Sequence, residues 1–156
     1  MADLVVTLTE SVLINGTQRG SNNTLTITDI EHTFERVVTI PANSDGTVLL
    51  TKDTIASSDG ATDIQDTKYI RVTNLDSTNN VNLSLQIDVN NNDSVADASA
   101  SISLPAGHSF IMGTPHDAIN VNSENASIVT AMKDLESIIV DSADQNVKVE
   151  LFVAGI

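Results

Sequence analysis

The stretch Val81-Asn-Leu-Ser-Leu-Gln-Ile-Asp-Val89 places an apolar side chain at every second position and a polar one between. Successive side chains of a β-strand point to opposite faces, so this alternation predicts a strand with one buried and one solvated face. The same period recurs at Leu4–Leu8, Leu25–Ile27, Val38–Ile40, Ile70–Val72 and Val147–Val153. The pattern is typical of antiparallel sheets that pack one face against a core.

Further candidate strands are short apolar runs, separated by turn residues such as Asn15-Gly16 and Asp76–Asn80. These runs are Ser11–Ile14, Val48–Leu50, Ile102–Leu104, Phe110–Met112 and Ile138–Val140. One segment, Asn125–Lys133, is expected to form a helical turn or two. Many short strands with almost no helix predict an all-β, two-sheet antiparallel sandwich that is jelly-roll-like, with an immunoglobulin-like sandwich as the alternative.

The composition favours one β domain with an aliphatic core. The chain has 156 residues, of which 40% are hydrophobic but only 3% aromatic, and β-branched side chains pack well on pleated sheets. This length suits a single domain spanning residues 1–156. We expect residues 1–15 to form either an N-terminal arm or an edge strand of the sandwich.

The charge of the chain argues against nucleic acid and membrane partners. The formal net charge is −14, and the seven Lys and Arg residues are scattered, so the chain repels phosphate backbones and anionic lipids. No apolar run approaches the roughly 20 residues that cross a bilayer. The N-terminus lacks the basic start and long apolar region of a secretory signal, so synthesis in a cytoplasm is expected.

The sequence shows no pattern of catalytic or cofactor-binding residues, and we expect no enzymatic activity, no cofactor and no metal site. There is no cysteine, no Gly-x-Ser-x-Gly elbow and no phosphate-binding loop. His108 and His116, with Asp117 adjacent, are the best candidates for a metal site, but their spacing favours a role in turns. The oxygen-rich segment Asp88–Asp97 departs from the calcium-loop pattern, which favours a solvated hairpin loop.

The N-terminal segment contains the candidate interface residues Leu4, Val6 and Leu8. They alternate along a strand at the chain end that has no proline or early lysine, and such an edge is suited to pairing with a neighbouring sheet. The other interpretation is that the segment is the first strand of the chain's own sandwich. In a domain with few aromatic residues and no disulfide, burial of a second apolar surface favours a stable homo-oligomer.

Four stretches in the middle and C-terminal parts resemble small virion proteins of tailed bacteriophages, particularly the marine and cyanophage type. They are Tyr69-Ile-Arg-Val-Thr-Asn-Leu-Asp-Ser-Thr-Asn-Asn-Val-Asn-Leu-Ser-Leu85, Leu104-Pro-Ala-Gly-His-Ser-Phe-Ile-Met-Gly113, Leu135-Glu-Ser-Ile-Ile-Val-Asp141 and Val147-Lys-Val-Glu-Leu-Phe-Val-Ala-Gly155. The resemblance implies a jelly-roll-like subunit that decorates or cements the capsid, commonly as a homotrimer. It also implies the major capsid protein or another virion protein as a partner, and a location on the capsid surface.

Two alternative functions remain open from the sequence. One is another phage structural role, such as a head-to-tail connector component or a tail or fibre accessory. The other is a carbohydrate-binding module, because jelly rolls also serve that purpose. Sugar recognition usually uses exposed aromatic side chains, and one Tyr, three Phe and no Trp argue against it.

Overall fold

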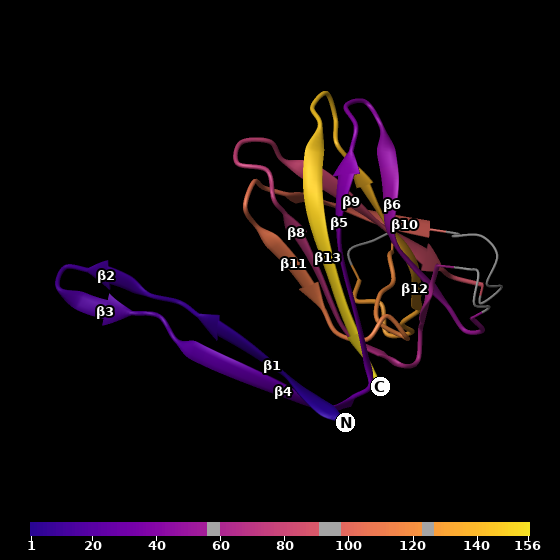
Figure 1. Cartoon of the computed structure of the whole chain (residues 1–156), viewed down its shortest axis with the longest axis horizontal. Helices are drawn as coiled ribbons and strands as arrows, with labels where there is room; N and C mark the ends of the chain where they lie inside the picture. Colours follow the sequence, from indigo (N-terminus) through magenta and orange to yellow (C-terminus); the bar gives the residue numbers. More distant parts are fainter. Residues whose placement is uncertain (56–59, 91–97, 123–126) are drawn as a thin grey trace.

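The protein is a β-sandwich with a long two-stranded arm, as the computed structural model shows (Figure 1). The structure describes residues 1–55, 60–90, 98–122 and 127–156. One sheet contains β6 (Asp45–Lys52), β9 (Val81–Asp88), β10 (Ala98–Leu104) and β12 (Asp134–Asp141), with the two-residue β7 (Thr62–Asp63) beside β6. The other contains β5 (His32–Ile40), β8 (Thr67–Asn74), β11 (Ser109–Met112) and β13 (Val147–Gly155).

The strand order within the described residues is that of a jelly roll. When the sandwich strands other than β7 are numbered from β5 to β13, the two sheets have the orders 1-8-3-6 and 2-7-4-5, and all these pairs are antiparallel. An immunoglobulin-like sandwich instead pairs consecutive strands in both sheets. The predicted all-β, jelly-roll-like sandwich is confirmed, and the immunoglobulin-like alternative is wrong.

The core is aliphatic, as the composition predicted. The inward faces of β8, β9, β12 and β13 are almost wholly buried, because these strands have neighbours on both sides and an opposing sheet above them. Each fully buried aliphatic side chain contributes about 1.5–3 kcal/mol relative to exposure. The largest fully buried side chains include Ile70, Leu83, Leu135, Ile138 and Leu151.

The arm comprises residues 2–30 and belongs to neither sheet. β1 (Ala2–Thr9) pairs with β4 (Asn22–Ile30), and β2 (Val12–Ile14) pairs with β3 (Thr17–Arg19) to form the tip. The turn at Asn15 and Gly16 has positive φ at both residues, as a tight two-residue hairpin turn requires. In Figure 1 the arm leaves the sandwich near the chain termini and its tip lies well beyond both sheets.

Gly20 joins the two halves of the arm. Its φ is +118°, and a Cβ atom at this position would lie 2.1 Å from the carbonyl oxygen of Glu10. The backbone amide of Glu10 donates to the carbonyl of Ser21 at 2.8 Å, and the Ser21 hydroxyl contacts the Glu10 carboxylate at 3.2 Å. Only glycine permits this close approach of the two strands, so the residue fixes the geometry between the base and the tip of the arm.

The turn that follows β8 is stabilised by side-chain oxygens. The carboxylate of Asp76 accepts hydrogen bonds from the backbone amides of Thr78 and Asn79 at 2.8 and 2.7 Å, which hold the pKa of Asp76 below its ordinary value. The fully buried Asn74 donates to the carbonyls of Asn79 and Leu104. The Asn-rich turn predicted between two strands is therefore an ordered connection.

Two sequence expectations differ from the structure. The helical turn expected at Asn125–Lys133 is absent from residues 127–133, where Lys133 instead pairs with Ile119 in an isolated antiparallel bridge. Residues 125 and 126 lie outside the described residues. Leu25–Ile27 forms a strand as predicted, but it lies in the arm, because its partner is β1 and not a strand of the sandwich.

Candidate interaction surface

The arm has one apolar face along β1 and β4. Directly paired residues of two antiparallel strands point to the same side, and the register pairs Leu4 with Ile27 and Val6 with Leu25. At the base, Leu4, Val6 and Ile27 pack against a small cluster on the sandwich made by Ile30, Tyr69 and Ala154. The base of the arm is therefore attached to its own sandwich by apolar contacts.

Beyond the base, the apolar side chains of the arm are exposed to solvent. We call the exposed apolar side chains on the face of Leu8 the arm patch, and its members are exposed by 50–56%: Leu8, Val12, Ile14 and Leu25. A two-stranded ribbon has no second layer that could cover these side chains, and such hairpins are marginally stable alone in water. Clustered exposed apolar side chains mark interaction surfaces in soluble proteins. The arm patch is the clearest candidate interaction surface on the described residues.

The three candidate interface residues from the sequence divide between two environments. Leu4 and Val6 are half-buried on the chain's own sandwich, whereas Leu8 is 56% exposed. Val12 and Ile14 continue the exposed surface toward the tip. The sequence could not separate these positions, because all five show the same apolar character within strands.

A shallow groove of about 360 Å³ lies between β1 and the outer face of the four-stranded sheet. The rings of Tyr69 and Phe152 make an edge-on contact in its wall, with centroids 6.1 Å apart. Arg71 lies over Phe152, 5.9 Å from the ring centroid, and forms an ion pair with Glu150 at 2.7 Å. Burial raises the pKa of Tyr69. These contacts support the joint between arm and sandwich.

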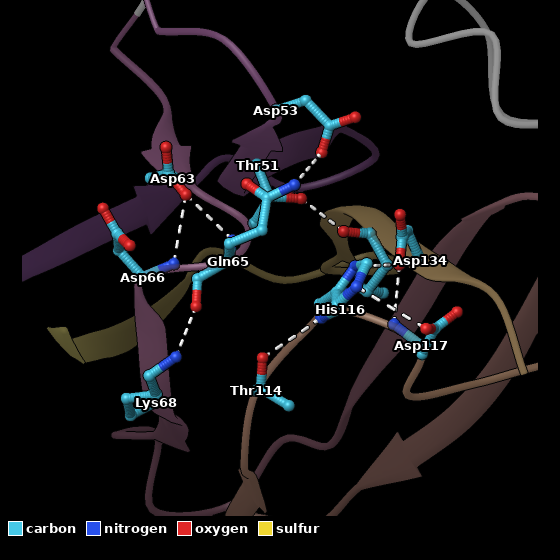
Figure 2. A network of polar contacts seen from close by, with 11 residues as sticks. Thr51, Asp53, Asp63, Gln65, Asp66, Lys68, Thr114, His116, Asp117 and Asp134 are labelled. Atoms are coloured by element: carbon cyan, nitrogen blue, oxygen red, sulfur yellow. Dashed lines mark hydrogen bonds and ion pairs between the residues drawn. The ribbon is translucent and has the colours of Figure 1, made fainter. Parts of the chain in front are cut away.

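The predicted candidate histidines have separate local partners. Nδ1 of His116 lies 3.0 Å from a carboxylate oxygen of Asp134, which also accepts the backbone amide of Asp117 at 2.6 Å (Figure 2). Nδ1 of His108 lies 2.9 Å from the carbonyl oxygen of Ala106. Among the described residues, no group of three or more His, Asp or Glu is arranged to hold a metal ion. The contacts of both histidines fix turns and loops.

A second part of the polar network holds the segment 63–68 in place. The Asp63 carboxylate accepts the backbone amides of Gln65 and Asp66 at 2.8 and 3.0 Å, and the Gln65 amide donates to Asp53 at 2.6 Å. Lys68 donates to the carbonyl of Gln65. In Figure 2 the carboxylate of Asp66 points away from the other labelled side chains. These hydrogen bonds hold the backbone of residues 63–66 in place, and the Asp66 carboxylate lies outside the network.

The oxygen-rich segment Asp88–Asp97 is described only in part. Asp88 is buried at the end of β9, and its carboxylate accepts the backbone amide of Asn90 at 3.1 Å. Residues 91–97 lie outside the described residues. β9 and β10, on either side of these residues, pair antiparallel, with Ile87 opposite Ala98.

Comparison of the chain with protein-family models, with curated proteins and with solved structures found no match. The described residues contain no helix long and apolar enough to cross a bilayer.

Proposed function

We propose that this protein is a non-enzymatic virion structural protein that decorates or cements the capsid of a tailed bacteriophage. The main observation that supports this proposal is the projecting arm. It extends from the sandwich in Figure 1 and exposes the arm patch, whose apolar surface gains free energy by burial against another protein. An exposed apolar surface on a projecting arm suits a subunit that assembles with other proteins.

The proposed partners rest on the arm patch together with the resemblance to phage virion proteins. Copies of the chain itself are the first partner, in a homo-oligomer that we infer to be a trimer, and the major capsid protein or another virion protein is the second. The net charge of −14 disfavours nucleic acid and anionic membranes. The sandwich would then lie on the capsid surface of the virion, where its polar, acidic outer faces contact water.

The carbohydrate-binding alternative has less support than the structural role. Tyr69 and Phe152 pack at the joint with the arm, and Phe110 packs against the main core. Phe34, which lines a different groove beside β5, is the one aromatic side chain of the described residues with a large exposed fraction, 42%. Sugar recognition usually uses broad aromatic surfaces for stacking.

Immunogold electron microscopy of phage particles purified from cultures that produce the protein tests the proposed function. We expect label distributed over the head at many copies, with the protein also detected by mass spectrometry of the same particles. Label confined to the tail would overturn the capsid assignment in favour of a tail or connector role. Absence of the protein from purified particles would overturn the virion proposal as a whole.

A further inference from the structure

The open edge of the sandwich beside β5 contains a second candidate interaction surface. β5 is the last strand of its sheet, so one backbone edge of residues 32–40 has no strand partner among the described residues. A groove of about 600 Å³ lies between this strand and residues 60–66. We call it the edge groove, and its main side chains are His32, Phe34, Arg36, Ile55, Asp63 and Asp66.

The floor of the edge groove is apolar and incompletely covered. Phe34 pairs with Val153, so both side chains point to the inner face of the sheet. Val153 is fully buried, whereas Phe34, on the edge strand β5, is 42% exposed. Ile55, 40% exposed, faces the same groove from the other wall. An inward-facing aromatic side chain that its own core leaves open is suited to contact with another protein.

The rim of the edge groove is acidic on one side. Asp63 is held by its hydrogen bonds to the 65–66 backbone, whereas the exposed Asp66 presents its carboxylate away from that network (Figure 2). Arg36 lies on the opposite wall of the groove, on β5. Its guanidinium donates a hydrogen bond to the carbonyl of Val48 and lies 5.3 Å from the Phe34 ring centroid. The acidic side of the groove, beside Asp63 and Asp66, therefore favours a partner with aliphatic side chains and a basic group next to them.

The tip of the arm has this combination on one face. Val12 pairs with Arg19 and Ile14 pairs with Thr17, so Val12, Ile14 and Arg19 share a face of the tip hairpin. Val12 and Ile14 are 50% and 53% exposed. Arg19 is the single Lys or Arg of residues 2–30, in a chain that carries only seven. The tip therefore matches the edge groove in both apolar surface and charge.

We propose that the arm tip of one copy docks in the edge groove of a second copy, with Val12 and Ile14 against Phe34 and Ile55, and Arg19 beside Asp66. This inference rests on the proposed function and names the surface that receives the arm. The tip lies beyond its own sandwich in Figure 1, whereas the edge groove is part of that sandwich. Tip and groove are different surfaces, so the contact is heterologous, and heterologous contacts that close form rings such as trimers.

Charge reversal in the full-length chain tests this docking. Arg19→Glu and Asp66→Arg each place like charges together, so each variant is expected to weaken self-association at least about 10-fold in sedimentation velocity. The double variant Arg19→Glu/Asp66→Arg restores opposite charges and is expected to recover most of the lost affinity. The matched control for Asp66→Arg is Asp144→Arg, which makes the same change of +2 in net charge at an exposed turn between β12 and β13.

A further variant, Phe34→Asp, tests the apolar floor of the edge groove without using the charge pair. The docking is overturned if Asp66→Arg and Phe34→Asp both associate as the wild type does while substitutions in the arm patch abolish association. In that outcome the arm still serves assembly, and the proposed function stands. A wild-type chain that does not associate at all overturns the docking together with the proposed homo-oligomer.

Discussion

Replacing Val12 and Ile14 by Asp together is expected to weaken self-association of the full-length chain by at least about 100-fold. Full burial of an exposed aliphatic side chain contributes about 1.5–3 kcal/mol, so burial of the exposed half of each contributes roughly half of that, and a carboxylate in its place also loses hydration. A change of about 1.4 kcal/mol corresponds to a tenfold change in affinity. Sedimentation velocity over a range of concentrations measures this loss. The substitution should leave the fold intact, because both side chains are half exposed in the free chain.

The matched control is Thr7→Asp/Thr9→Asp. It adds the same charge at the same spacing on the same arm, but on the face opposite Leu8, where Thr7 and Thr9 pair with Thr24 and Asn22. We expect this control to associate as the wild type does within a few fold. Equal losses in both variants would indicate that added charge alone weakens association, which would contradict the role of the arm patch.

The second prediction compares one substitution in two environments. Leu83→Ala should lower the free energy of unfolding by about 2–5 kcal/mol, because it leaves a cavity among fully buried side chains. Leu8→Ala should change it by no more than about 0.5 kcal/mol, because Leu8 lies on the arm beyond the sandwich. Both variants are made in the Val12→Asp/Ile14→Asp background, so that association does not add to stability.

Urea unfolding, followed by circular dichroism, measures both free energies. The informative result is the difference between the losses of unfolding free energy at Leu83 and Leu8, because the two residues are of the same type and lie in strands with the same alternation. A loss at Leu8→Ala as large as that at Leu83→Ala would show that the arm belongs to the cooperative core. The projecting arm of Figure 1 would then not describe the chain in solution.

The strand positions were predictable from the sequence because period-two alternation is a local signal. The pattern at Val81–Val89 corresponds to β9, and the pattern at Val147–Val153 lies within β13. The jelly-roll-like sandwich was likewise predictable from strand number and turn chemistry. The expected helical turn near Lys133 failed because pairing with Ile119 outweighs weak local helix preference.

The extent of the arm was not predictable in the same way. Leu25–Ile27 alternates as Ile70–Val72 does, yet the first pairs with β1 in the arm and the second lies in the core. Only long-range pairing separates the two, and no local property of the residues records it. The edge groove depends on the distance between β5 and residues 60–66, which the sequence does not encode locally either. Val12 and Ile14 were visible as apolar residues but not as an exposed surface.

The central claim is that this chain is an assembly subunit that associates with copies of itself through its arm. Sedimentation velocity of the wild-type, full-length chain at micromolar concentration tests it most directly. The predicted result is a single species with three times the 16.5 kDa mass of the chain, which dissociates in the Val12→Asp/Ile14→Asp variant. A wild-type chain that sediments as a 16.5 kDa monomer across this concentration range would contradict the claim.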